Sequence, residues 1–407
     1  MSRGAEPATG RRHPVGNNLQ MAVRIRPPAE ADVLAMYRAD GTAFGSQWKP
    51  EDIERTRPTI DLERFRIAVD GDDVVGTAGS FALEMTVPGG ATLPTGGVTW
   101  VSSAVTHRRQ GVLRSLMQAI HDDIDERDEP LAALGASEGG IYERFGYGVA
   151  SVRRGVEIDR RRAQLRPEYR PASGSVRLVH PDEAVALFMP RWERARRSRP
   201  GEVSRDEAWM RMLVADVADK ATFAVHDDGF AMWKTDPQWH MGHPAHEVWV
   251  NDLAAATPEA HAALWHTLLS LDLTGPIRSL VVPIDDPLPY LLTDRRALRT
   301  TGITDGLWLN LRDVKRCFEA RAYGTDDDIV VEADDVRWRI GGGGCSKVRS
   351  RAHLQSDRAS LSALLLGGVR PSALVAGRRM TARNADVLRR ADALFTTSPE
   401  PYCQTGF

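Results

Sequence analysis

The chain is poor in cysteine and has no long apolar run. Its 407 residues include only three cysteines, Cys317, Cys345 and Cys403, which are scattered and form no C-x-x-C pair. This spacing argues against a disulfide framework and against a structural zinc site, so we expect reduced thiols and no bound metal. No apolar segment approaches the roughly 20 residues that are needed to cross a bilayer.

An excess of either charge is also missing. The 53 Lys and Arg residues face 55 Asp and Glu residues, which gives a formal net charge of −2. Without a basic excess, the chain has no general electrostatic attraction for a nucleic-acid duplex or an anionic membrane. Hydrophobic residues make up 42% of the sequence, enough to bury a core. We therefore expect a cytoplasmic enzyme or binding protein whose partner is a small molecule.

The length favours two or three domains. Residues 1–20 are polar and lack the apolar segment of a secretory signal, so they are predicted to be a disordered leader, with Met21 as an alternative start. Strand and helix signals alternate through residues 21–160, and the same rhythm repeats through residues 161–311. The sequence therefore predicts two α/β units with mixed sheets.

The last block, residues 312–407, has a different pattern. Residues 329–340 alternate as a strand, and a run of four glycines, 341–344, follows. The run is not followed by Lys-Ser/Thr and opens no helix, so it does not read as a phosphate loop. A hairpin turn is the expected structure, with helical segments further on.

The most informative stretch runs from a predicted strand, 98–105, through a basic turn into a predicted helix, 109–126. Backbone N–H groups at a helix start are unpaired and carry the positive end of the helix dipole. A pyrophosphate binds well there, with Gly111 allowing close approach and Arg108 and Arg109 adding charge-assisted hydrogen bonds. A basic helix start with a purely structural role is the alternative.

A second motif, residues 136–148, follows a short predicted strand at 131–134. A tyrosine here could protonate a departing thiolate, because its ordinary pKa near 10 keeps it protonated at neutral pH. Tyr142 is the first choice and Tyr147 the second, and a structural role is the alternative for each. The base is less clear: residues 98–105 contain no carboxylate, which leaves Glu84 and Glu138 as candidates.

These motifs resemble known enzymes. Residues 108–113 (RRQGVL) resemble the R/Q-x-x-G-x-G/A signature of the GNAT acetyltransferase superfamily, although Leu113 occupies the last small-residue position. Together with residues 137–142 (SEGGIY) and the tail 401–407 (PYCQTGF), they resemble the enhanced intracellular survival (Eis) family of aminoglycoside N-acetyltransferases.

The Eis resemblance implies a whole architecture. It implies an α/β (α+β) chain of tandem GNAT folds, 21–160 and 161–311, followed by a sterol-carrier-protein-like domain, 312–407, and assembly as a homo-hexamer. The second GNAT fold has AAATPE at 254–259 in place of a phosphate-binding signature, so it is not expected to hold acetyl-CoA.

The resemblance also assigns roles within the site. Acetyl-CoA would be the donor, Tyr142 the general acid, and the terminal carboxylate of Phe407 the general base. Trp48 and Trp100 would line the amine pocket, with core packing as the alternative. Family members carry an acidic residue before the terminal Phe, where this chain has Gly406. The residues expected to bind acetyl-CoA are Val101, Ser102 and Ser103 through their backbone, Arg108, Arg109, Gln110, Gly111, Val112, Leu113 and Arg114 at the pyrophosphate, and Ser137 and Glu138 near the thioester.

The predicted function is direct transfer of acetyl groups to aminoglycoside amines, at one position or several. A protein-lysine or polyamine N-acetyltransferase is the alternative among enzymes. The alternative from another class is a lipid- or sterol-binding protein that works through residues 312–407 and carries a vestigial transferase domain. Intact Arg108, Arg109, Gly111 and Tyr142 argue against this last reading.

Overall fold

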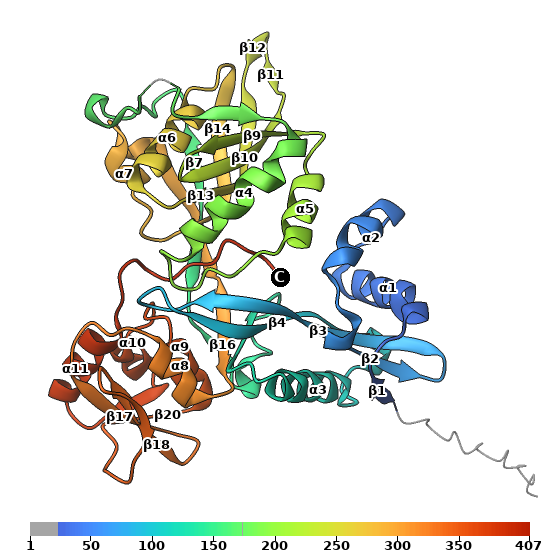
Figure 1. Ribbon diagram of the computed structural model, residues 1–407, viewed down its shortest axis with the longest axis vertical. Helices are drawn as coiled ribbons and strands as arrows, with labels where there is room; N and C mark the ends of the chain where they lie inside the picture. The colour runs from blue at the N-terminus through green and yellow to red at the C-terminus, as the bar shows by residue number, and fades with distance from the viewer. Residues whose placement is uncertain (1–22, 173) are drawn as a thin grey trace, which may run out of the picture.

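Three α/β units follow one another along the chain (Figure 1). The computed structural model describes residues 23–172 and 174–407, so the predicted leader at 1–20 lies outside the described residues. The first unit is built on a seven-stranded sheet. Its strands, in spatial order, are β1 (Arg24–Arg26), β2 (Phe65–Asp70), β3 (Asp73–Thr86), β4 (Thr92–Ser103), β5 (Leu131–Gly135), β16 (Leu307–Leu311) and β6 (Gly148–Val149).

Helices cover both faces of this first sheet. Helix α3 (Val112–Glu126) carries apolar residues three and four positions apart, and this stripe packs against Ala68, Val75 and Val98. Helix α1 (Val33–Phe44) packs through Met36 and Tyr37 against the alternate residues of β2, on the opposite face. The sheet therefore holds the start of α3 and one side of α1 at fixed positions relative to β4.

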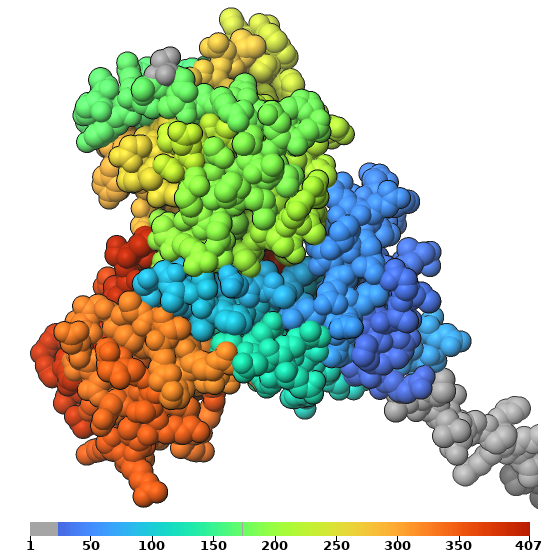
Figure 2. Space-filling model, viewed as in Figure 1, coloured from blue at the N-terminus to red at the C-terminus, as the bar shows by residue number. Residues whose placement is uncertain are grey.

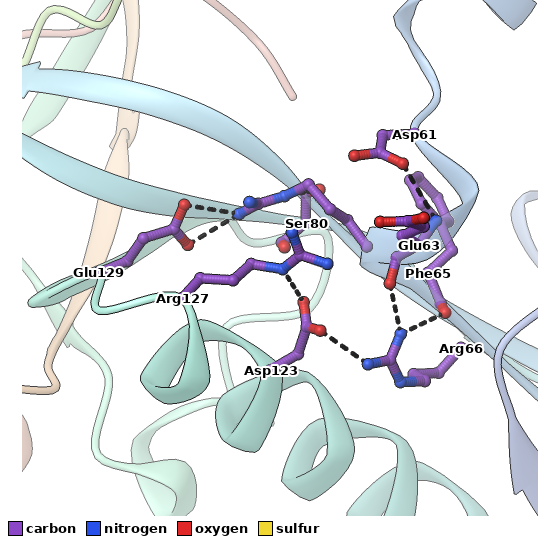
Figure 3. A network of polar contacts seen from close by, with 9 residues as sticks. Asp61, Glu63, Phe65, Arg66, Ser80, Asp123, Arg127 and Glu129 are labelled. Carbon is purple, nitrogen blue, oxygen red and sulfur yellow. Dashed lines mark hydrogen bonds and ion pairs between the residues drawn. The ribbon is translucent and has the colours of Figure 1, made fainter.

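A network of buried and half-buried ion pairs fastens α3 to the sheet (Figure 3). The Arg66 guanidinium binds Asp123 of α3 at 2.7 Å, and Arg127 binds the other carboxylate oxygen at 2.9 Å. Nearby, Arg64 binds both oxygens of Glu129, at 2.8 and 2.7 Å. The Arg66 pair joins β2 to α3, and the Arg64 pair holds the segment just after the helix, so together they restrain α3 against the sheet.

The second unit has a seven-stranded sheet whose strand order shows an exchange with the first. The predicted boundaries at 160 and 311 place the strand at 152–159 in the first unit and the strand at 307–311 in the second. The sheet pairings place them the other way round. Strand β16 pairs with β5 on one side and β6 on the other. Every one of its residues is buried, as expected for an apolar strand in the interior of a sheet that is covered on both faces. The order of the second sheet is β15 (Leu298–Asp305), β7 (Val152–Asp159), β14 (Thr274–Val282), β13 (His246–Ala255), β10 (Gly229–Asp236), β9 (Ala221–His226) and β8 (Arg177–Val179), with α4 (Pro181–Arg196), α5 (Glu207–Ala215) and α6 (Pro258–Leu269) packed on it.

The third unit is a five-stranded sheet with short helices. Gly341 pairs with Gly344, so the glycine run is the hairpin turn that the sequence predicts. The three cysteines are free and buried. The strands of the third unit, in spatial order, are β19 (Gly344–Lys347), β18 (Val336–Gly341), β17 (Asp328–Ala333), β20 (Leu354–Ser356) and β21 (Met380–Ala382). Its helices are α8 (Val314–Ala320), α9 (Arg358–Ala363), α10 (Pro371–Ala376) and α11 (Ala385–Phe395).

The chain does not end within the third unit. After α11, a tail formed by residues 396–407 returns to the first unit and ends close to β4 and α5 (Figure 1). In the space-filling view the second unit, green to yellow, lies directly over the first (Figure 2). Within residues 23–172 and 174–407, no helix is long and apolar enough to cross a membrane.

Candidate active site

A cleft of about 1140 Å³ lies between α1, the end of β4 and the start of α3. Most residues that the sequence assigns to acetyl-CoA line it. The exception is Gln110, whose side-chain amide turns back and donates to the Thr106 carbonyl at 3.3 Å. The lining includes Val101, Ser102, Ser103, Arg108, Arg109, Gly111, Val112, Leu113, Arg114, Ser137, Glu138 and Tyr142.

The start of α3 forms an anion seat at one end of this cleft. Gly111 caps the helix with a φ of +85°, a conformation that favours glycine. The helical hydrogen-bond ladder begins at Ser115 N–H, which donates to the Gly111 carbonyl at 3.0 Å, so the preceding N–H groups are not used by the helix. With Arg108 and Arg109 on the same cleft, these groups fit a pyrophosphate.

Replacing Gly111 by Ala should weaken acetyl-CoA binding specifically. A β-carbon there meets no neighbour within 4 Å, so the expected effect comes from backbone strain at φ +85° and not from a clash. The strain, about 1 kcal/mol, should shift the N–H groups of the seat and raise the KM for acetyl-CoA by about five-fold. Steady-state kinetics with acetyl-CoA varied checks this, and an unchanged KM would argue against a pyrophosphate at this turn.

Strand β4 is irregular where the cleft reaches the sheet. Thr77 pairs with Ser102 and Gly79 with Thr99, so Trp100 and Val101 together oppose a single residue of β3. Trp100 has a φ of +51°, and its carbonyl accepts a hydrogen bond from Thr77 Oγ1 at 2.6 Å. Such a bulge releases backbone groups from the ladder, which leaves Val101 able to bind a ligand.

The parallel strands β4 and β5 part at the same level. Their pairing covers only Thr95 to Gly97 on β4 and Leu131 to Ala133 on β5, and both strands continue beyond it. The gap between them is where an acyl-pantetheine arm is expected to enter.

Tyr142 lies at the junction of two cavities. It is 7% exposed and lines both the large cleft and a neighbouring cavity of about 250 Å³. Burial raises the pKa of its hydroxyl above the usual value, and the negative charge of Glu138 raises it further. The hydroxyl therefore stays protonated at neutral pH and can act as an acid.

Tyr147, the second choice from the sequence, is placed differently. It is fully buried, and its hydroxyl pairs with Nε2 of His121 at 3.0 Å. Burial raises the pKa of this hydroxyl, too. Because it lines neither of the two cavities that Tyr142 lines, a structural role fits it better than proton donation.

The smaller cavity ends at the C-terminus of the chain. Phe407 lines it together with Tyr142. A β-carbon on Gly97 would be 3.2 Å from the Phe407 ring, and one on Gly135 would be 3.9 Å from an oxygen of the Phe407 terminal carboxylate. The last residue therefore lies where β4 and β5 part, and two glycines leave room for it. Gly406 is exposed, and a β-carbon there would meet nothing within 4 Å.

Asp40 is a site residue that the sequence reasoning missed. It is 5% exposed and lines the same cavity as Tyr142 and Phe407. Burial raises the pKa of Asp40 to about 6, although the hydrogen bond from Trp48 Nε1, 3.1 Å long, lowers it. The sequence contained a signal for it: Asp40 follows Met36 by four residues and Tyr37 by three, so helical spacing places this carboxylate on the buried face of α1.

Of the remaining predicted residues, Trp100 and Glu138 line one of the two cavities, and Trp48 and Glu84 line neither. Trp100 lines the smaller cavity, whereas Trp48 stacks on Trp100 with ring centroids 5.5 Å apart and holds Asp40. Glu138 lines the large cleft. Glu84 is drawn away from both cavities, because its carboxylate binds Arg196 at 2.9 Å.

A bulged strand, a splayed parallel pair and an anion seat at the start of the next helix define the first unit as an acetyltransferase of the GNAT class. Residues 24–150 and 201–312 both match an acetyltransferase (GNAT) domain family, and residues 314–404 match a sterol carrier protein domain family.

Full-length relatives give the family. The chain is 36% identical over 399 residues to N-acetyltransferase Eis of Mycobacterium tuberculosis, covering 93% of this chain and 98% of that protein. It superimposes on the crystal structure of Eis1 from Mycobacterium abscessus with a TM-score of 0.85 and 32% identity, covering 94% and 100% of the two chains. A GCN5-related N-acetyltransferase from Anabaena variabilis, 18% identical with a TM-score of 0.81, shares the fold and covers 95% and 100% of the two chains. The chain belongs to the Eis family of N-acetyltransferases and is an acetyl-transferring enzyme.

Proposed function

We propose that this enzyme transfers acetyl groups from acetyl-CoA directly to amines of aminoglycosides, at one position or several. Tyr142 is the general acid and the terminal carboxylate of Phe407 the general base. One observation carries the proposal: Tyr142 lines both the large cleft that fits the donor and the smaller cavity that contains Phe407. This shared position supports a mechanism in which Tyr142 acts between the donor and the base.

In this mechanism each proton has a defined path. The acceptor amine loses a proton to the Phe407 carboxylate, and its nitrogen forms a bond to the acyl carbon of the thioester. Backbone groups at Val101 to Ser103 orient the carbonyl. As the carbon–sulfur bond breaks, the Tyr142 hydroxyl donates its proton to the leaving thiolate, which gives coenzyme A and an N-acetylated product.

The charges around the smaller cavity favour a cationic acceptor. Asp40 and Phe407 both line it, and the Asp40 carboxylate is anionic above its pKa of about 6. A protonated amine next to the reacting one would be attracted to Asp40. Gly406 adds no third carboxylate, so a polycationic aminoglycoside should bind less strongly than it would with an acidic residue at this position.

A panel of acceptors tests the proposed substrate class. Thiol release from acetyl-CoA is measured with aminoglycosides, polyamines and lysine peptides, and mass spectrometry counts the acetyl groups added. We expect the highest kcat/KM with an aminoglycoside. A higher kcat/KM with polyamines or lysine peptides would show that these, and not aminoglycosides, are the substrate class. Saturable lipid binding without acetyl-CoA binding would support the lipid-carrier alternative.

Light scattering on the same preparation tests the hexamer that the family implies, and cell fractionation tests the cytoplasmic location.

Replacing Asp40 by Asn should lower activity and raise stability at the same time. In the folded protein the pKa of Asp40 is raised to about 6 from 3.8, so ionisation costs stability as the pH rises through this window. Asn stays neutral and can still accept the Trp48 hydrogen bond. We expect the variant to be more stable than the parent by about 1–2 kcal/mol at pH 8 and equal to it near pH 4.

The same substitution is expected to weaken binding of the acceptor. Above pH 6 the variant should show about a ten-fold higher KM for a polycationic acceptor, with the KM for acetyl-CoA unchanged, because one desolvated charge contact is lost. Urea unfolding at the two pH values and acceptor kinetics at pH 8 check both parts. Equal stability of the two proteins at pH 8 would show that Asp40 is not an ionised, buried group.

A further inference from the structure

One short segment of the second unit makes most of the hydrogen bonds that hold the tail that brings Phe407 to the cavity. This segment, residues 197–206, is the linker between α4 and α5 and is called the strap below. Its contacts follow the tail residue by residue. Arg199 donates to the Glu400 carbonyl at 2.8 Å, Tyr402 N–H donates to the Pro200 carbonyl at 2.9 Å, Gln404 N–H donates to the Glu202 carboxylate at 3.1 Å, and Arg205 Nε donates to Thr405 Oγ1 at 2.9 Å. The Asp285 carboxylate and the Val281 carbonyl, which accept from Glu400 N–H and the Tyr402 hydroxyl, hold the tail as well.

The other side of the strap pairs with the first unit. Gly201 N–H donates to the Thr86 carbonyl at 2.8 Å, and Thr86 N–H donates back to the Glu202 carbonyl at 2.9 Å. Met85 and Val203 form an antiparallel bridge between them. The strap thus lies between the end of β3 and the tail. This placement fixes the tail relative to the same sheet that carries the acetyltransferase site.

Arg205 is the most deeply held member of the strap. Its side chain is 2% exposed, and it forms an ion pair of 2.5 Å with the equally buried Asp252 of β13. Its guanidinium also stacks on the Trp192 ring at 3.6 Å. A planar guanidinium fixed on two sides directs its remaining N–H groups in one direction. One of these, Nε–H, points at Thr405.

Thr405 is the last tail residue that a side-chain hydrogen bond fixes to the strap. Beyond it, Gly406 is exposed and a β-carbon on it would meet nothing within 4 Å, and Phe407 lies half-buried beside Gly97 at the gap between β4 and β5. Apart from the packing of the Phe407 ring against the core, Thr405 is therefore the last point at which the tail is held before the terminal carboxylate. Loss of the Arg205 contact would leave the end of the chain free to swing around Gly406.

We propose that Arg205 is a positioning residue that, through Thr405, holds the terminal carboxylate in the reaction cavity. On this proposal the second GNAT unit, which lacks a phosphate-binding signature of its own, serves as the support (the mount) that holds the tail and positions its terminal carboxylate. The inference rests on the proposed role of Phe407 as general base. Arg205 touches neither donor nor acceptor in this arrangement, and it acts only by restricting the tail.

Two substitutions remove the contact from opposite sides. Arg205→Gln removes it from the strap, and Thr405→Val removes it from the tail while nearly preserving side-chain volume. Because displacement of a reacting group by about 1 Å can cost 10²-fold, we expect each to lower kcat by roughly 30- to 100-fold, with the KM for acetyl-CoA unchanged. Thr405→Ser keeps the hydroxyl and should retain near-parental kcat. If Arg205→Gln fails to fold, the Thr405 pair decides the question alone.

Arg321→Gln is the matched control. Arg321 is 4% exposed and donates to four carbonyl oxygens within the third unit, none of which lies in the tail: those of Ala322, Leu364, Leu365 and Phe395. Its loss should destabilise the fold by an amount similar to Arg205→Gln and leave kcat within about two-fold of the parent.

A second readout follows the tail without using activity. Carboxypeptidase A releases a C-terminal phenylalanine from a free tail, so Phe407 should leave the Arg205→Gln and Thr405→Val proteins at least ten-fold faster than the parent or the control, because protection falls as the open state becomes more populated. Parental kcat and parental resistance in both variants would overturn the proposal, even if an extension past Phe407 abolishes turnover. If that extension leaves turnover unchanged, Phe407 is not the general base. An unchanged kcat in Arg205→Gln would then show that the contact between Arg205 and Thr405 has no role in catalysis.

Discussion

Replacing Tyr142 by Phe is expected to lower kcat by about 100-fold or more, because general acid catalysis commonly contributes 10²–10⁴. The change removes one hydroxyl and keeps the ring of a residue that is only 7% exposed, so the packing around β5 should survive. Binding of acetyl-CoA should also survive, since the anion seat at Gly111 is untouched. The expected signature is a fall in kcat with little change in the KM for acetyl-CoA.

Tyr147→Phe is the control for this experiment. Tyr147 is fully buried and its hydroxyl is occupied by His121, so its removal should cost about 1 kcal/mol of stability while leaving kcat within a few-fold of the parent. Thiol release at saturating donor, followed for both variants and for the parent, separates the two roles. If Tyr142→Phe keeps more than half of the parental kcat, another group protonates the thiolate.

Adding a single glycine after Phe407 should have an effect of similar size. The extension converts the terminal carboxylate into a peptide group and moves the new carboxylate about 3.5 Å along the chain. A peptide carbonyl is too weak a base to take the proton from the attacking amine, so we expect a loss in kcat of about 100-fold with the KM for acetyl-CoA unchanged. The same glycine placed before Met1 serves as the control for added length.

The outcome of the extension also decides between bases. Glu138 and Asp40 line the two cavities beside Tyr142, whereas Glu84 is bound to Arg196. If the extended enzyme retains full turnover, Glu138→Gln and Asp40→Asn become the next substitutions to test, and the assignment of Phe407 is wrong.

The sequence predicts the local parts of this site well. The strand, the basic turn and the helix at 98–126 are neighbours along the chain, and their chemistry follows from unpaired N–H groups, a glycine and two arginines. In the structure β4 ends at Ser103, α3 begins at Val112, and the turn between them lines the cleft. Tyr142 could be chosen for the same reason, because its motif follows the short strand β5 directly.

The parts that depend on tertiary structure could not be read from spacing. Nothing local connects Phe407 with Tyr142, and only the family resemblance placed them together. The exchange of β7 and β16 between the two sheets is equally invisible, because sequence order does not say which sheet a strand joins. The mount for the tail requires a strap that contacts β3 on one side and Thr405 on the other, a juxtaposition that exists only in the folded chain.

The most direct test of the account compares two chains that differ only in the final carboxyl group. Protein ligation can produce one chain that ends in the Phe407 acid and one that ends in its amide, which has the same shape and no negative charge. With acetyl-CoA and an aminoglycoside, the acid form should release thiol and yield N-acetylated product, and the amide form should bind acetyl-CoA equally well but turn over at least 100-fold more slowly. Equal turnover of the two chains would contradict the central claim that the end of the chain supplies the base.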